Sequence, residues 1–148
     1  MATSDVRQDP CVTDPGAAGE AVSSVDVVFP DWANHHGTLF AGRILELVSR
    51  AAFTAASRAT RKPIVLARII EMEFLAPVYV GELVVTTATL GARSRRSQLV
   101  QVRAEAEEIA TGARRMAVRG TMLMVIVPGR SGPPTWSGQP ASLAEVGA

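Results

Sequence analysis

The sequence has very little of several residue types, and each shortage excludes a class of protein. Cys11 is the only cysteine, which excludes an internal disulfide, a CxxC redox pair and a cysteine-based zinc cluster. The only histidines, His35 and His36, are adjacent, and no partner residues stand at metal-ligand spacing, so we expect no metal site. No apolar run approaches the roughly 18 residues of a membrane-spanning helix. Because residues 1–12 also lack the apolar segment of a secretory signal, we expect a cytoplasmic protein that does not associate with membranes.

Neither sign of charge is in excess. Lys and Arg total 15 while Asp and Glu total 14, which gives a net charge of +1. We do not expect so balanced a chain to offer a surface for nucleic acid. Lys62 is the only lysine, so almost all the positive charge is guanidinium, which makes planar, bidentate contacts with phosphates. Codon bias alone would also explain this preference for arginine.

The composition predicts one globular domain between two flexible ends. Hydrophobic residues make up 47% of the chain and charged residues only 20%, which is enough apolar material for a core. Residues 1–23 show no periodicity and are expected to form a flexible arm. Residues 129–148 are rich in Pro, Gly and Ser and are expected to form a flexible tail. The domain is therefore expected to span residues 24–128.

The pattern of apolar residues predicts one helix among strands. Strands are expected at residues 25–29, 64–75, 82–90, 101–107 and 114–127, and a long helix at residues 39–58. One helix face is apolar at Ile44, Leu47, Val48, Ala51, Ala52 and Ala55. Further apolar positions make this helix apolar almost all round, so we expect the sheet to curl around it. The order β-α-β-β-β-β indicates an α+β fold with an antiparallel sheet.

Two sequence blocks suggest a family. Residues 34–42 read NHHGTLFAG at the entry to the helix, and residues 74–82 read FLAPVYVGE. Together they resemble the N-x-x-G-T-L-F-G-G and F-x-x-P-V-x-V-G-D/E patterns of hotdog-fold acyl-CoA thioesterases. The resemblance implies a central helix wrapped by a curved antiparallel sheet. It also implies a hydrolase for acyl-CoA or acyl carrier protein thioesters, in which coenzyme A or phosphopantetheine is part of the substrate and no other cofactor is needed.

The resemblance assigns roles to the residues at the helix entry. In the family, the start of this helix lies near the thioester carbonyl. The N–H groups after Gly37 and around Ala41 and Gly42 would then stabilise the oxyanion, since free N–H groups at a helix start carry partial positive charge. Asn34 would position the thioester or the attacking water.

One position departs from the family pattern. Where active relatives carry a helix carboxylate, this chain has Ser49, and a serine hydroxyl is not a general base at neutral pH. Glu46, one turn earlier, is one replacement, although it stands at the spacing of an ion pair with Arg50. His35 or His36 is another, because imidazole takes up protons near neutral pH. A third hypothesis is that the protein dehydrates or cyclises a tethered acyl chain, or binds acyl thioesters without catalysis.

A basic turn is the candidate for binding the substrate carrier. The residues expected to do so are Arg93, Arg95, Arg96 and Ser97. Arg114 and Arg115 are expected to gather near the same edge of the sheet. Guanidinium groups would bind the phosphates of coenzyme A, or attract the acidic surface of an acyl carrier protein.

The resemblance also predicts the assembly. Hotdog domains pair two sheets edge to edge, so we expect a homodimer or a dimer-based tetramer. The site would lie at the dimer interface, with the asparagine and the helix residue from different chains. The last strand is strongly apolar at residues 122–127, which would make it an aggregation hazard as an open edge. We therefore expect it to be buried in the core or in an interface.

Overall fold

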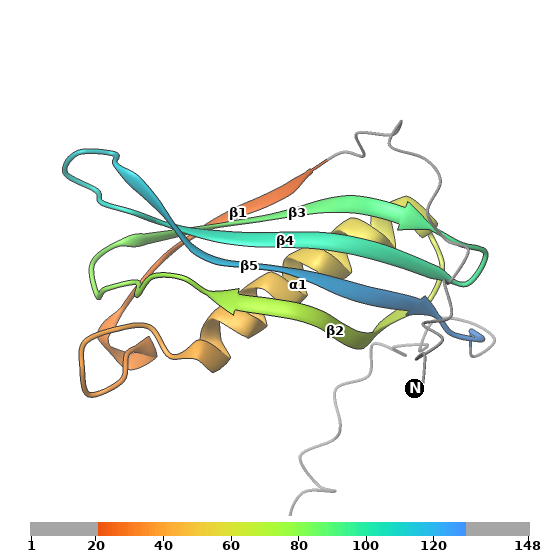
Figure 1. The fold of residues 1–148 in the computed structure, drawn as a ribbon, viewed down its shortest axis with the longest axis horizontal. Helices are drawn as coiled ribbons and strands as arrows, with labels where there is room; N and C mark the ends of the chain where they lie inside the picture. Colours follow the sequence, from red (N-terminus) through yellow and green to blue (C-terminus); the bar gives the residue numbers. More distant parts are fainter. Residues whose placement is uncertain (1–20, 130–148) are drawn as a thin grey trace, which may run out of the picture.

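A single helix packs against one curved, five-stranded sheet (Figure 1). The computed structural model describes residues 21–129, so most of the expected arm and tail lie outside the described residues. The strands are β1 (Val22–Val27), β2 (Ile64–Phe74), β3 (Leu83–Arg93), β4 (Ser97–Glu107) and β5 (Arg114–Ile126). The helices are the short η1 (Pro30–Trp32) and the long α1 (Ala41–Thr60).

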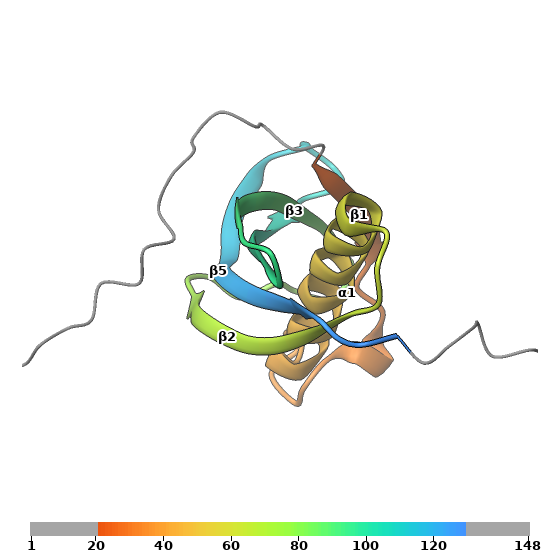
Figure 2. The same ribbon diagram turned by 90° about the vertical axis from the view of Figure 1, so that its right-hand side faces the viewer.

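The sheet is antiparallel throughout and runs in the order β1-β3-β4-β5-β2. Seen along the helix, it curves around α1, with β1 on one side and β2 on the other (Figure 2). The predicted order of elements and the wrapped helix are confirmed. The helix connects β1 to β2, which lie at opposite edges of the sheet, and hairpins join the neighbouring strands β3, β4 and β5.

The bounds of α1 differ from the prediction by two residues at each end. It begins late because the Leu39 N–H donates to the Val78 carbonyl oxygen at 2.8 Å, which keeps the entry segment extended. At its other end the Thr60 hydroxyl donates to the Ala56 carbonyl oxygen at 2.8 Å. The helix stops at Arg61, which adopts the left-handed conformation with φ of 52°.

The core lies between α1 and the inner face of the sheet. The six positions of the predicted apolar face are all buried, and so is Ala56. Phe53, in contrast, is 49% exposed. The curved sheet of one chain therefore covers one face of α1 and leaves Phe53 on the opposite face accessible.

The open edges of the sheet are β1 and β2, whereas β5 lies between β4 and β2. The prediction that the last strand is buried is confirmed at Met122 and Met124, which have no exposed surface. Leu66 and Ile69 of β2 lie opposite these methionines and share the helix-facing side, yet they are 38% and 41% exposed. The edge that remains uncovered is thus apolar.

No helix within residues 21–129 is both long enough and apolar enough to cross a membrane.

Candidate active site

The loop at residues 34–40 is shaped by the side chain of Asn34. Its Oδ1 accepts hydrogen bonds from the His36 N–H at 2.9 Å and from the Thr38 N–H at 3.3 Å. The Thr38 hydroxyl lies 2.9 Å from the Asn34 amide nitrogen and 3.1 Å from Oδ1. Gly37 has φ of 74°, which glycine adopts without strain. In this chain, therefore, the Asn34 amide is engaged within its own loop.

A second loop, residues 75–82, holds the first one in place. The Val78 carbonyl oxygen accepts the Leu39 N–H at 2.8 Å, and the Val80 N–H donates to the Gly37 carbonyl oxygen at 3.1 Å. Thr38 and Tyr79 form a β-bridge between these two contacts. The two sequence blocks that carry the family resemblance are thus hydrogen-bonded to each other.

The start of α1 leaves backbone donors open. Phe40 at the N-cap makes no side-chain cap, and the first turn contains no acidic residue. The first amides with acceptors are those of Arg43 and Ile44, which both donate to the Phe40 carbonyl oxygen. The N–H groups of Ala41 and Gly42 have no acceptor within residues 21–129. They carry the positive end of the helix dipole, so they can bind a developing negative charge.

An apolar cavity of about 270 Å³ opens beside these donors. Its lining consists of Leu39, Ala41, Ile44, Phe74, Leu75, Ala76, Pro77 and Val78. These residues come from the two hydrogen-bonded loops, the start of α1 and the end of β2. An apolar wall next to unpaired N–H groups suits a ligand with an apolar chain attached to a carbonyl group.

Glu46 is held in an exposed ion-pair network. Its carboxylate accepts from Arg43 Nη1 at 2.7 Å and from Arg50 Nη2 at 2.6 Å. The Arg43 guanidinium also lies over the Trp32 ring, 4.6 Å from the ring centre. The ion pair that the sequence spacing suggested for Glu46 is therefore present, together with a second one.

Ser49 lies two turns along α1 from Gly42, on the same exposed stripe as Glu46. Seven residues of helix correspond to about 10 Å along the axis. Ser49 is half-buried and its hydroxyl has no hydrogen-bond partner within the described residues. One chain therefore does not place the Ser49 hydroxyl beside the open N–H groups at its own helix start.

His35 and His36 lie in the first loop, just before Gly37, and both are exposed. Their ring centres are 3.8 Å apart. They belong to the same short loop whose backbone leads into Ala41 and Gly42. The loop therefore carries both the imidazoles and the approach to the helix donors.

The predicted carrier-binding turn lies at the other end of α1. A helix of 20 residues spans about 30 Å, and the Arg93 Nη1 donates to the Ala59 carbonyl oxygen at 3.3 Å near its last turn. The Ser97 hydroxyl lies 2.7 Å from the Ser94 hydroxyl and helps to close the turn. The side chains of Arg95 and Arg96 have no ion-pair or hydrogen-bond partner within the described residues.

Two corrections concern the arginines. Arg114 and Arg115 do not join the basic turn, because they face Glu107 and Ala106 at the opposite end of β4. The shared edge was expected because the sequence alone does not show which strand ends meet. Arg61 and Lys62 were not predicted as part of this basic region, although they directly follow α1, whose last turn contacts Arg93. Figure 1 shows the end of α1 and the β3–β4 turn at the same end of the molecule. The place of Arg61 and Lys62 directly after the helix was the available signal.

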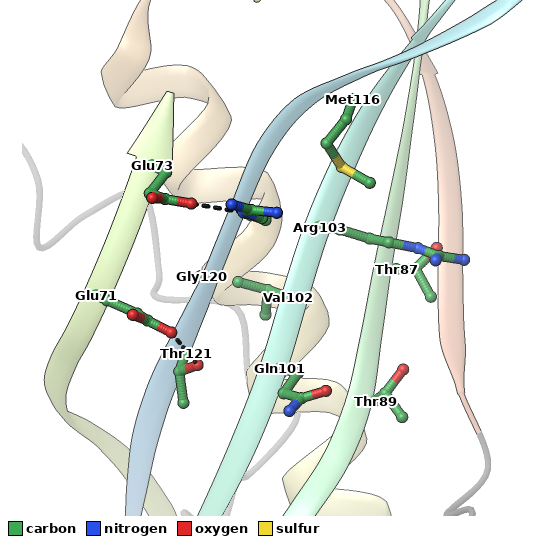
Figure 3. Close-up of a pocket in the computed structure, with 11 residues that line it drawn as sticks. Glu71, Glu73, Thr87, Thr89, Gln101, Val102, Arg103, Met116, Gly120 and Thr121 are labelled. Carbon is green, nitrogen blue, oxygen red and sulfur yellow. Dashed lines mark hydrogen bonds and ion pairs between the residues drawn. The ribbon is translucent and has the colours of Figure 1, made fainter. Parts of the chain in front are cut away.

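A larger hollow of about 310 Å³ lies on the outer face of the sheet (Figure 3). Its side chains are mainly Thr, Gln, Glu and Arg from β2, β3, β4 and β5, and none comes from α1 or from the two loops. Arg119 Nε pairs there with Glu73 Oε2 at 2.5 Å. This hollow is therefore separated by the sheet from the donors at the start of α1.

The part of the chain that the structure describes contains no set of side chains arranged to bind a metal ion. No three His, Cys, Asp or Glu side chains there gather closely enough to hold a metal ion. The groups that one chain brings to the start of α1 are the open backbone donors, the apolar cavity and the two imidazoles of the loop.

Comparison with known proteins links this geometry to a chemical class. Residues 36–113, more than half of the chain, match the thioesterase superfamily. The human cytosolic acyl coenzyme A thioester hydrolase is 30% identical over 105 residues, which are 67% of this chain and 28% of the human protein. The mouse acetyl-coenzyme A thioesterase is 33% identical over 99 residues, 65% of this chain and 18% of that protein. The chain thus spans less than a third of the length of these relatives.

A solved structure shares the fold. The acyl-CoA hydrolase from Bacillus cereus superposes with a TM-score of 0.71 at 31% identity, over 73% of this chain and 66% of that chain.

Proposed function

The chain belongs to the thioesterase superfamily and has its hotdog fold, and from that premise we propose that it hydrolyses acyl-CoA or acyl carrier protein thioesters. The observation that carries this proposal is the uncapped start of α1, where the N–H groups of Ala41 and Gly42 stay open beside an apolar cavity. Coenzyme A or phosphopantetheine enters as part of the substrate, and no further cofactor takes part. The relatives named cytosolic support action in the cytoplasm.

The open donors define the orientation of the substrate. The thioester carbonyl oxygen points at the N–H groups of Ala41 and Gly42, and the acyl chain enters the apolar cavity. Water attacks the carbonyl carbon, and the negative charge that develops on the oxygen is stabilised by these donors. The intermediate then collapses, the C–S bond breaks, and the products are a carboxylic acid and a free thiol.

The proton of the attacking water goes to a loop histidine. His35 and His36 are exposed and lie in the loop that leads into the donors, whereas the Glu46 carboxylate already binds two guanidinium groups. General-base catalysis by imidazole is the common solution near neutral pH. Asn34 keeps the loop in shape, and the Ser49 hydroxyl orients water or substrate.

A second copy of the chain completes the site. The uncovered, apolar edge strand β2 starts near the basic turn and ends at Phe74, which lines the cavity. Two β2 strands that pair antiparallel about a two-fold axis place the cavity end of one copy beside the basic end of the other. The same pairing covers exposed Leu66 and Ile69, and brings Ser49 of one copy toward the helix start of the other. The unit is a homodimer, alone or doubled into a tetramer.

The dimer also gives the basic turn a role. In one chain, about 30 Å of helix separates Arg95 and Arg96 from the open donors. From the second copy, Arg93, Arg95, Arg96 and Ser97 reach the phosphates of the substrate carrier, and Arg61 and Lys62 add to them. A related acyl-CoA thioesterase, 26% identical with a TM-score of 0.71, is described as hexameric, which supports assembly beyond one chain.

The test is thiol release from short, medium, long and aromatic acyl-CoAs and from the same acyl groups on a carrier protein. We expect turnover on at least one acyl group. Faster release from the CoA series would assign the basic turn to phosphates, and faster release from the carrier series would assign it to an acidic protein surface. Binding of acyl-CoA without thiol release by the folded dimer would contradict the proposal and favour a non-catalytic binding module.

A further inference from the structure

Glu82 and Arg115 form a bidentate ion pair at the end of the sheet that lies near the candidate active site. Arg115 Nη1 donates to Glu82 Oε1 at 2.7 Å, and Nη2 donates to Oε2 at 2.5 Å. Glu82 stands just before β3, and Arg115 is the second residue of β5. The Glu82 side chain is only 15% exposed, so water screens this pair less than a surface pair.

The pair also fixes the backbone of the 75–82 loop. Arg115 Nη2 donates to the Pro77 carbonyl oxygen at 2.8 Å, and Glu82 Oε2 accepts the Tyr79 N–H at 2.8 Å. The Arg115 guanidinium lies 5.5 Å from the centre of the Tyr79 ring. Two side chains thus hold both halves of a loop that belongs to no strand or helix.

That loop is the support of the helix start. Its Val78 carbonyl oxygen accepts the Leu39 N–H at 2.8 Å, and its Val80 N–H donates to Gly37 at 3.1 Å. Leu39 and Phe40 lead directly into Ala41 and Gly42. Hydrogen bonds, joined by short stretches of covalent backbone, therefore link the ion pair to the helix start that carries the open donors.

We propose that Glu82 and Arg115 are positioning residues that hold the Ala41 and Gly42 N–H groups in the geometry for oxyanion binding. The inference rests on the proposed hydrolase function. Neither side chain touches the cavity lining except through Pro77, so neither is a catalytic residue. Their effect is on geometry, and a displacement of about 1 Å at a reacting centre costs roughly 100-fold in rate.

The ion pair withstands mild acid. The hydrogen bond from Arg115 holds the pKa of Glu82 below its ordinary value, against the opposing effect of burial, and the Tyr79 N–H adds to the lowering. Tyr79 and Glu108 are the other titratable groups that act on Arg115. Because the pKa of Glu82 is lower when folded, its stabilising contribution is complete above the ordinary carboxyl pKa. It disappears only as the pH falls through the lowered value.

The test compares two single variants, Glu82→Gln and Arg115→Lys, with the double variant in steady-state thiol release. We expect kcat to fall about tenfold or more in each single variant, with KM changed by less than about threefold. The double variant should be hardly worse than either single one, because both changes break the same unit. Amide hydrogen exchange at residues 37–40, whose N–H groups are hydrogen-bonded in the segment that leads into the helix start, should become faster in all three variants.

The neighbouring ion pair provides a matched control. Arg114, one residue away on β5, pairs through Nε with Glu107 Oε2 at 2.5 Å, and within the described residues it makes no hydrogen bond or ion pair to the 75–82 loop. Arg114→Lys and Glu107→Gln should leave kcat and the amide exchange at residues 37–40 unchanged.

The outcomes separate this inference from the proposed function. Wild-type enzyme that releases thiol, with both variants retaining kcat and slow exchange, would overturn the positioning role. A rise in KM without a fall in kcat would mean that the ion pair contributes to substrate binding. That result would also overturn the positioning role. Absence of thiol release from the wild type would instead refute the hydrolase function, while the exchange measurement would still test whether the pair fixes the helix start.

Discussion

Gly42 and Ser49 lie on the same stripe of α1 but two turns apart, about 10 Å along the helix axis. The open N–H groups at the helix start and the Ser49 hydroxyl therefore do not converge within one chain. This separation is the structural reason for placing the site between two copies. It also allows the two positions to be tested independently.

Gly42→Ala tests the role of the helix start in turnover separately from its effect on the stability of the fold. A Cβ atom at this position meets nothing within 4 Å, and alanine is favoured over glycine in helices. We expect the free energy of unfolding to stay the same or to rise by up to about 1 kcal/mol. Turnover should nevertheless fall at least about tenfold, because the added methyl group occupies the space where the thioester approaches the donors. Urea unfolding and thiol release measure the two quantities, and full activity would remove the helix start from the site.

Ser49→Asp supplies the carboxylate that the sequence resemblance led us to expect at this position. If the stripe faces the thioester of the second copy, a carboxylate there acts as a general base, which typically contributes about 100-fold or more. We expect a clear rise in kcat, measured by thiol release at neutral pH. Ser49→Asn is the matched control, because it has the same shape and no basicity. Equal rates for the two variants would place Ser49 outside the reacting region.

Ile69→Lys tests the pairing of edge strands. Ile69 is 41% exposed at the middle of β2, so in the proposed two-fold pairing of β2 strands a lysine there places two positive charges close together in the interface. We expect sedimentation velocity to show a monomer, and thiol release to be lost with it. Ile109→Lys, at a hairpin position that is 61% exposed, should remain oligomeric and active. A dimeric and active Ile69→Lys protein would argue against β2 as the interface.

Thr86→Val tests the cost of a buried hydroxyl group that lacks a hydrogen bond. The Thr86 hydroxyl is fully buried beneath α1 and has no hydrogen-bond partner within residues 21–129. Valine has nearly the same shape without the polar group, so the free energy of unfolding should increase by about 1 kcal/mol. Thr60→Val is the control, because it removes a hydroxyl that does bond, to the Ala56 carbonyl oxygen. For Thr60→Val we expect the free energy of unfolding, measured by urea unfolding, to decrease.

Local patterns in the sequence were enough to predict the main elements. The helical spacing of Ile44, Leu47, Val48, Ala51, Ala52 and Ala55 predicted the buried face, because burial of one stripe is a property of the helix itself. The first residues of β4 were not predicted as strand, because the segment begins with the polar residues Ser97 and Gln98. Gln98 there is buried, with its side-chain nitrogen bonded to the backbone oxygens of Gly91 and Leu99, and such compensation leaves no periodic signal.

Relations between distant residues were harder to predict. The expectation that Arg115 joins the basic turn was wrong because the direction of strands decides which ends meet, and sequence texture does not contain that information. Glu82 and Arg115 are 33 residues apart, and their pairing depends on the sheet order. The sequence predicted the local part of the candidate site, residues 34–42, whereas the contacts of the ion pair that hold this part in place are seen only in the structure.

The most direct test of the account compares thiol release by the wild type, His35→Ala/His36→Ala and Glu46→Gln on the best acyl thioester, with all three proteins folded and dimeric. The account predicts that loss of the two imidazoles lowers kcat by about 100-fold or more, whereas Glu46→Gln keeps most of the activity. Full turnover without the histidines, together with its loss in Glu46→Gln, would contradict the account and assign the base to the helix.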